Sequence, residues 1–141
     1  MAALVPSVDV YYWPMMGRAG AVMHMLNYAK IPYTHKSDFG DIASIGSAFG
    51  SSAGDTFAPP IVVDGDVTVS QSIACCVYIG KKCGLVEGLD EIKALQYLLD
   101  IVDAFENGVS KASMEGGAQL KAFFEGDRYV ALCSHNFVAE D

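Results

Sequence analysis

The sequence predicts an α/β domain followed by a shorter segment made only of helices. Two observations carry this prediction. Strand and helix patterns alternate up to about residue 84, and beyond that point only the helical period continues. A pair of β-branched triplets around a turn signal adds a hairpin to the first part. The predicted order is β-α-β-loop-β-β-α, with one domain at residues 1–84 and an all-α domain at residues 85–141.

The first strand and helix are predicted from a change of period. Residues 8–13 alternate in character and are rich in Val and Tyr, which is typical of a strand, and Pro14 and Gly17 follow them. From Arg18 apolar residues recur every three or four positions, which predicts a helix that ends before Pro32. This part of the chain is therefore strand, short loop, helix.

The middle of the first domain contains a loop-rich stretch and then a hairpin. A second strand is predicted to start at residues 32–34. Residues 38–55 are rich in Gly, Ser and Ala, so only a short helical turn near residues 41–45 is expected there. The triplets at 61–63 and 67–69 flank Asp-Gly-Asp, which predicts two antiparallel strands joined by a tight turn.

Helices are predicted on both sides of the domain boundary. Residues 73–83 have a helical period, with Ser70 and Ser72 as caps at the start and Gly84 just past the end. From Glu87 onward a long helix presents one apolar face. That face comprises Ile92, Leu95, Leu99, Val102 and Phe105. A further helical segment is predicted at residues 119–124.

Composition and charge exclude several classes of function. Apolar residues make up 52% of the 141 residues and charged residues only 18%, which predicts a folded chain with apolar surface left for a partner. The formal net charge of −8 argues against binding to nucleic acid. Apolar stretches fall far short of the roughly 18–20 residues that cross a bilayer, so no membrane insertion is expected.

The cysteines and the first residues bear on the compartment. Cys75, Cys76, Cys83 and Cys133 lack the spacing of a metal site, and we interpret them as reduced thiols of an intracellular protein. Residues 1–17 contain neither Lys nor Arg, unlike a secretory or transit peptide. The expected compartment is therefore the cytoplasm, or an organelle if a targeting peptide has been removed. The three histidines also lack ligand spacing, so no metal is expected.

Two separated stretches resemble a known family. They are YWPMMGRA at residues 12–19 and PPIVVDGDVTVSQSIA at residues 59–74. Together they resemble the N-terminal domain of the cytosolic glutathione S-transferases, and the tyrosine-type classes such as pi and sigma are most similar. The resemblance covers about residues 5–85 and extends loosely along 87–107. It implies a thioredoxin-like domain followed by a helical domain, which in this chain is truncated.

The resemblance assigns the catalytic position to Tyr12. A free thiol has a pKa near ~8.5, so a positioned hydroxyl that donates to the sulfur favours the reactive thiolate of glutathione. Without the resemblance, Tyr12 is interpreted as a core aromatic at the end of a strand. The catalytic role therefore depends on the resemblance.

Further positions match the part of the family that binds glutathione. Gln71 and Ser72 stand where a strand turns into a helix, and in the family this pocket holds the γ-glutamyl carboxylate. The alternative is that Ser70 or Ser72 only caps the helix. Arg18 either adds positive charge there or anchors the first helix. These alternatives stay open from the sequence.

Two more matches concern the turn before the hairpin and the long helix. Pro60 matches the proline that is cis in thioredoxin-like folds, and Pro59 precedes it, where the family presents its backbone to the ligand. Asp103 resembles an acidic residue that reaches the amino group of glutathione in the neighbouring subunit of a dimer. A solvated acidic helix face is the alternative for Asp103.

The sequence also departs from the family pattern. Pro59 has no N–H, so one of the two main-chain hydrogen bonds to glutathione cannot form. Ala58 stands where a glutamine is common. Ala43 stands where the family has a lysine that faces the glycine carboxylate, and Lys36 is the candidate substitute. These departures predict weak glutathione binding.

Two functions from different classes follow. The first is a glutathione transferase-like protein with a degenerate glutathione site that acts as a non-catalytic docking subunit of a larger assembly. Its expected contact with another chain is the helical segment 89–107 together with the C-terminal tail, as a homodimer or a hetero-assembly. The alternative is an active glutathione S-transferase in which Tyr12 activates the thiol. Pro59 and the truncated helical domain favour the first function.

Overall fold

The computed structural model describes residues 8–51, 56–86, 88, 90–104 and 116–126. The chain divides into two compact units, Met1–Glu87 and Gly88–Asp141. Each unit is described by itself.

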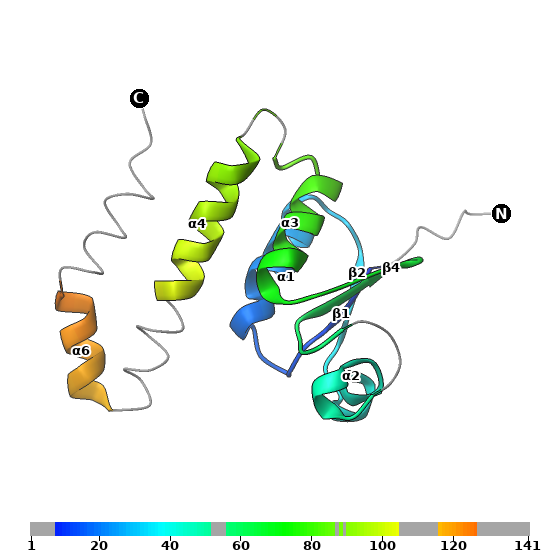
Figure 1. Cartoon of the computed structure of the whole chain (residues 1–141), viewed down its shortest axis with the longest axis horizontal. Coiled ribbons are helices and arrows are strands. Elements are labelled where there is room, and N and C mark those ends of the chain that lie inside the picture. Colours follow the sequence, from blue (N-terminus) through cyan, green and yellow to red (C-terminus); the bar gives the residue numbers. More distant parts are fainter. Residues whose placement is uncertain (1–7, 52–55, 87, 89, 105–115, 127–141) are drawn as a thin grey trace. The chain divides into compact units, whose positions relative to one another are not determined.

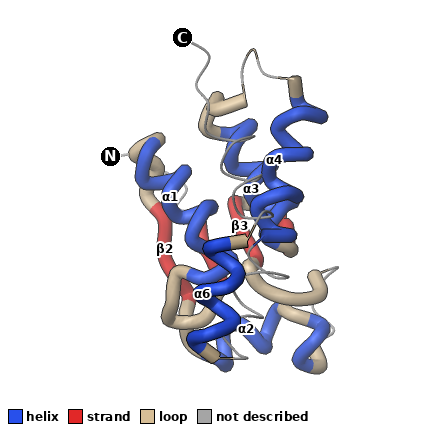
Figure 2. Tube along the Cα trace, turned by 90° about the vertical axis from the view of Figure 1, so that its left-hand side faces the viewer, coloured by secondary structure: helices blue, strands red, loops and turns tan. Residues whose placement is uncertain are grey.

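The first unit contains a mixed sheet of four strands. They are β1 (Val8–Tyr11), β2 (Tyr33–Lys36), β3 (Ile61–Asp64) and β4 (Val67–Ser70), arranged in the order β2-β1-β3-β4. β1 pairs with β2 in parallel, whereas the β1–β3 and β3–β4 pairs are antiparallel. In Figure 2 the strands are the separate red segments, of which β2 and β3 are labelled. The predicted hairpin is confirmed and lies at one side of the sheet.

Helices cover both faces of this sheet. α1 (Gly20–Tyr28) follows a short 3-10 turn, η1 (Gly17–Ala19), and α3 (Ser72–Lys82) follows β4. α1 and α3 lie side by side against one face, and α2 (Phe39–Ile45) lies on the other side of the strands (Figure 1). This arrangement confirms the predicted thioredoxin-like α/β domain.

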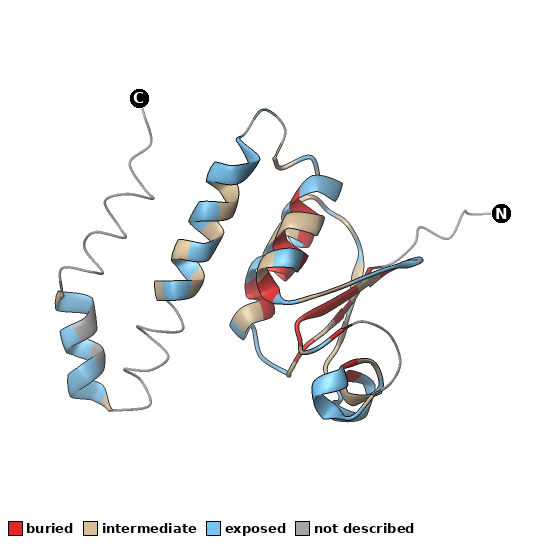
Figure 3. Cartoon of the chain, viewed as in Figure 1, coloured by how far each residue is buried: buried red, intermediate tan, exposed pale blue. Residues whose placement is uncertain are grey.

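The core of the first unit lies between the sheet and the pair α1 and α3. Val10 of β1, Leu26 of α1 and Ile79 of α3 are completely buried. Figure 3 shows the buried residues gathered on these elements. Burial of each such side chain stabilises the fold by about 1.5–3 kcal/mol. The apolar face of the sheet therefore packs against the apolar faces of α1 and α3.

The segment after β2 differs from the prediction. A loop with only a short helical turn was expected at residues 38–55, but α2 has seven residues and is followed by a 3-10 turn, η2 (Ser47–Phe49). The carboxylate of Asp38 accepts a hydrogen bond from the amide of Gly40 at 2.8 Å and caps α2, and Ile42 is buried. A cap and one buried contact therefore outweigh the weak helical propensity of Gly and Ser.

The second unit contains two described helices, α4 (Glu91–Ala104) and α6 (Gly117–Glu125). Asp90 caps α4, because its carboxylate accepts hydrogen bonds from the amides of Ile92 and Lys93 at 2.9 and 3.2 Å. α6 confirms the predicted helical segment at 119–124. Phe105 of the predicted apolar face lies outside the described residues. Within the described ranges, no helix is both long and apolar enough to cross a membrane.

A buried carboxylate ties the hairpin to α3. Asp64 is 8% exposed, and its Oδ2 accepts a hydrogen bond from the Tyr78 hydroxyl at 2.7 Å and lies 2.7 Å from Lys82 Nζ. Burial alone would raise the pKa of Asp64, but the hydrogen bonds from Lys82 and Tyr78 and the charge of Lys82 outweigh it and lower that pKa. The bond to Asp64, together with burial, raises the pKa of Tyr78 to about 12.

We expect Asp64→Asn to lower the free energy of unfolding by about 1–3 kcal/mol, because Lys82 loses its ion pair in a partly buried place. The pKa of Asp64 is lowered in the folded protein. Its contribution is therefore complete above the ordinary pKa of 3.8 and is lost as the pH falls through the lower folded value. Urea unfolding at neutral and acidic pH measures both effects. Asp66→Asn, at an exposed position in the same turn, is the control, and an equal loss in both variants would contradict the assignment.

Candidate functional site

Tyr12 lies directly after β1 and is 5% exposed. Its hydroxyl oxygen accepts a hydrogen bond from the backbone amide of Arg18 at 2.9 Å. Its own amide donates to the carbonyl of Lys36 at 3.1 Å, which continues the pairing with β2. Because the Tyr12 hydroxyl oxygen accepts this bond, the hydroxyl hydrogen can donate to an anion such as a thiolate. The accepted bond also polarises the O–H group and makes it a stronger donor.

Gly17 makes this approach of helix and tyrosine possible. A Cβ at Gly17 would lie 2.7 Å from the Tyr12 hydroxyl oxygen and 2.9 Å from a ring carbon, and the φ of Gly17 is +32°. Both the contact and the positive φ favour glycine over any other residue. The glycine of the YWPMMGRA stretch therefore has a direct steric role in placing the Tyr12 hydroxyl.

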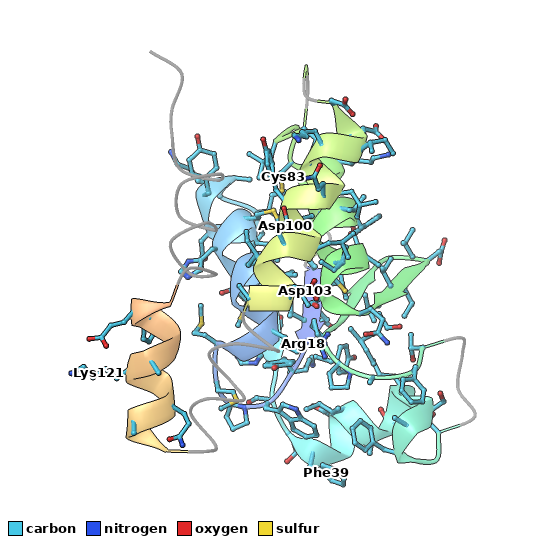
Figure 4. The ribbon with its side chains drawn as sticks, turned by 60° about the vertical axis from the view of Figure 1, so that its left-hand side comes forward. Arg18, Phe39, Cys83, Asp100, Asp103 and Lys121 are labelled. Atoms are coloured by element: carbon cyan, nitrogen blue, oxygen red, sulfur yellow. The ribbon has the colours of Figure 1, made fainter. Side chains whose placement is uncertain are left out.

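Arg18 connects the beginning of the first helical segment to the beginning of α3. Its Nη2 lies 3.4 Å from Ser72 Oγ, a residue 54 positions further along the chain. Arg18 is half-buried and is labelled in Figure 4. Three residues singled out in the sequence, Tyr12, Arg18 and Ser72, are thus brought together by one run of contacts.

The junction of β4 and α3 presents unpaired backbone amides. The first bond of the helix runs from the amide of Cys75 to the carbonyl of Gln71. The amides of Ser72, Ile73 and Ala74 therefore have no carbonyl within the helix to bind. Together with the helix dipole, they form a place that attracts a carboxylate.

Gln71, and not a serine, is the residue that precedes α3. Its φ of 76° and ψ of 132° are unusual for a residue with a side chain, and its side chain makes no capping bond. The prediction of serine caps is therefore wrong: Ser72 is the first helical residue and faces Arg18. Strained backbone of this kind costs about 1–3 kcal/mol and is concentrated at binding sites.

The turn before β3 has a cis bond between Pro59 and Pro60, as predicted. Both prolines are buried. The carbonyl of Pro60 accepts from the amide of Gln71 at 3.1 Å and lies 3.5 Å from Cys75 Sγ. This contact joins the turn to the α3 junction. Pro59 offers a carbonyl but no N–H to a ligand.

Two further positions from the sequence analysis are Ala43, where the lysine of the family is missing, and Asp103. Ala43 is half-buried in α2, which carries Asp41 in its first turn and no basic residue in its last turn. Asp103 lies at an exposed position of α4 in the second unit. Its role toward glutathione stays a prediction.

Three aromatic rings, missed by the sequence analysis, pack together beside the site. We name Trp13, Phe39 and Phe49 the aromatic cluster. The Trp13 and Phe39 rings are stacked with centroids 6.1 Å apart, and Phe49 meets each of them edge-on at 5.7 and 5.8 Å. The signal was weak because two of the rings come from the stretch expected to be loop. Phe39 projects outward from α2 in Figure 4.

The cysteines of α3 are poor nucleophiles. Burial raises the pKa of Cys75 to about 12 and that of Cys76 to about 11, so both are protonated at neutral pH. Both side chains are buried in the core of the first unit. In the described part of the chain, no three His, Cys, Asp or Glu side chains form a group that could hold a metal ion. Cys133 lies outside the described residues.

Solved structures of glutathione S-transferases and prostaglandin synthases have a fold similar to that of this chain. No protein-family model and no curated protein matches the sequence. The structure of prostaglandin synthase D of Nilaparvata lugens matches with a TM-score of 0.58 and 22% identity, over 87% of this chain and 62% of that one. Rat hPGDS in complex with a quinoline matches with a TM-score of 0.57 and 23% identity, over 92% and 65%.

A glutathione S-transferase from Ascaris lumbricoides gives a similar result. Its TM-score is 0.56 and its identity 14%, over 94% of this chain and 64% of that one. The chain thus has a glutathione transferase-like, thioredoxin-type fold with a helical part, and it spans about three fifths of the length of these structures. The predicted fold class is confirmed.

We expect Gly17→Ala to displace the Tyr12 hydroxyl and to destabilise the first unit by more than about 1 kcal/mol. The added Cβ would have to occupy space within 2.7 Å of that hydroxyl. Gly65→Ala is the matched control, because Gly65 also has a positive φ, +61°, but has open space around it. Urea unfolding of both variants measures the difference. An equal loss in the two would mean that only backbone strain, and no contact with Tyr12, is involved.

Proposed function

We propose that this chain is a glutathione transferase-like protein whose glutathione site is degenerate, and that it serves as a non-catalytic docking component of a larger protein assembly. The observation on which the proposal depends is the pairing of two features at one site. The run of contacts through Tyr12, Arg18 and Ser72 is present, whereas Pro59 cannot donate at the adjoining turn.

The features that support residual glutathione binding lie at α3. A γ-glutamyl carboxylate has the amides of Ser72 and its successors, the Ser72 hydroxyl and the Arg18 guanidinium within one small region. Charge-assisted hydrogen bonds to such groups are worth about 1.5–3 kcal/mol each. The thiol of the same ligand has the Tyr12 hydroxyl as a donor.

The features that support weak binding lie at the turn and on α2. Pro59 leaves one carbonyl of the ligand without its main-chain donor. α2 offers Ala43 where the resemblance implies a lysine, and its first turn is acidic. Loss of two such contacts, at about 1–3 kcal/mol each, raises a micromolar dissociation constant for glutathione toward the millimolar range.

An active glutathione S-transferase is the second candidate. The hydrogen bond between the Arg18 amide and the Tyr12 hydroxyl favours it, because this bond leaves the hydroxyl hydrogen free to stabilise a thiolate. The solved structures with a similar fold are also named as transferases or synthases. In this alternative Tyr12 is the catalytic residue.

We expect calorimetry to give a dissociation constant for glutathione in the millimolar range, and a further loss of affinity of about tenfold for Ser72→Ala, since the carboxylate loses a donor. Ser70→Ala, at the end of β4, is the control that should keep the affinity. Pro59→Leu restores an N–H and should tighten binding.

Glutathione binding and conjugation assays on the unmodified chain and on Tyr12→Phe distinguish the two candidate functions. A low-micromolar dissociation constant, combined with conjugation of an electrophile that Tyr12→Phe abolishes, would establish the active enzyme and contradict the docking proposal. Weak binding without conjugation supports the docking proposal.

The docking part of the proposal is supported by the apolar face of α4. None of its described residues is buried, and the side chains of Ile92 and Leu99 are 74% and 50% exposed. Contiguous exposed apolar surface of this kind is typical of protein interfaces. The proposed partner is another polypeptide, either a second copy or a different subunit. The tail beyond residue 126, which we also expected to take part, lies outside the described residues.

We expect the purified chain to bind a hydrophobic dye or to self-associate, and Leu99→Glu to reduce both, because a charge replaces apolar surface. Gln96→Glu, at an exposed polar position of α4, is the matched control. Dye fluorescence and sedimentation measure the two effects. A chain that remains monomeric at high concentration and binds no dye would contradict the docking proposal.

A further inference from the structure

The aromatic cluster lies at the same end of β1 as the Tyr12 hydroxyl, because Trp13 is the residue that follows Tyr12. Trp13 is half-buried, but Phe39 is 61% exposed and Phe49 37% exposed. Two of the three rings therefore present apolar surface to solvent. Edge-on and stacked rings hold each other in place, so this surface is ordered.

The charges beside the aromatic cluster disfavour an anion. Asp38 caps α2 and Asp41 lies in its first turn, so the positive end of this short helix is already neutralised by the protein. Lys36 of β2 is basic, but its charge affects the pKa of Tyr11 alongside the carboxylates of Asp9 and Asp41. Burial is the largest cause that raises the pKa of Tyr11; the charges of Asp9 and Asp41 raise it further, and the charge of Lys36 lowers it.

The opposite polarity is found at α3. There the Arg18 guanidinium, the Ser72 hydroxyl and unpaired helix amides favour a carboxylate. The site thus has an anion-binding end, a hydroxyl donor at Tyr12 and an apolar end bordered by acidic residues. A ligand that matches it has one carboxylate end, a central thiol and an uncharged apolar end.

We propose that the aromatic cluster binds the uncharged, apolar end of a γ-glutamyl thiol, so that the site prefers ligands whose far carboxylate is masked by an ester or amide over glutathione itself. This inference rests on the proposed function for the γ-glutamyl end at Ser72. It adds the ligand class: a γ-glutamylcysteine derivative with an aromatic or otherwise apolar group at its carboxyl end.

Trp13 is the single tryptophan of the chain, so its fluorescence reports directly on the aromatic cluster. We would titrate the full chain with glutathione, with glutathione esterified at its glycine carboxyl by benzyl alcohol, and with N-acetylcysteine benzyl ester. The last probe keeps the apolar end and lacks the γ-glutamyl carboxylate. We expect the glutathione benzyl ester to bind about tenfold more tightly than glutathione and to change the Trp13 emission.

Phe39→Ala tests the aromatic cluster without disturbing the core, because Phe39 is largely exposed. It should reduce the tenfold preference for the benzyl ester to near unity. Phe57→Ala is the matched control: Phe57 is 60% exposed in the same unit and is not part of the aromatic cluster. This control should retain the preference.

The outcomes distinguish this inference from the proposed function. Equal affinities for glutathione and its benzyl ester, a preference that survives Phe39→Ala, or an unchanged Trp13 emission with both benzyl esters would each overturn the inference, whatever glutathione does. If N-acetylcysteine benzyl ester binds as tightly as glutathione benzyl ester, the γ-glutamyl end is not recognised. That result would overturn the ligand class and the proposed γ-glutamyl contact at Ser72, while the docking role is tested separately by dye binding and self-association.

Discussion

The hydrogen bond from the Arg18 amide to the Tyr12 hydroxyl links the end of the first strand to the start of the first helical segment. The bond can form only because Gly17 has no Cβ between the two groups. Once it forms, the direction of Arg18 is set, and its guanidinium reaches Ser72 at the start of α3. A single close approach of backbone to a phenol ring therefore assembles groups from three parts of the chain.

Most of the fold was predictable from the period of apolar residues. The β-branched triplets at 61–63 and 67–69 predict a hairpin with Gly65 in its turn, and the structure contains this hairpin. α2 was underestimated because its sequence is poor in strong helix formers. Its stability comes from the Asp38 cap and from burial of Ile42, and burial is a tertiary effect that a local pattern does not contain.

The candidate site was predictable in part, and mainly through the resemblance. Tyr12 and Ser72 could be singled out because each lies in a quoted stretch, but no local pattern says that Arg18 joins them. The capping role expected for serine was wrong because Gln71 takes the strained position before α3 and turns Ser72 toward Arg18. The aromatic cluster was missed for the same kind of reason, since Trp13 and Phe39 meet only in the folded chain.

The sheet has two outer strands, β2 and β4, and each is only four residues long. β2 contains His35 and Lys36, and β4 is held in register by its tight turn to β3. A short outer strand with polar side chains offers few free amides and carbonyls to an incoming strand, which protects a protein from polymerising edge to edge. Growth of this sheet into a larger one through either outer strand is therefore disfavoured.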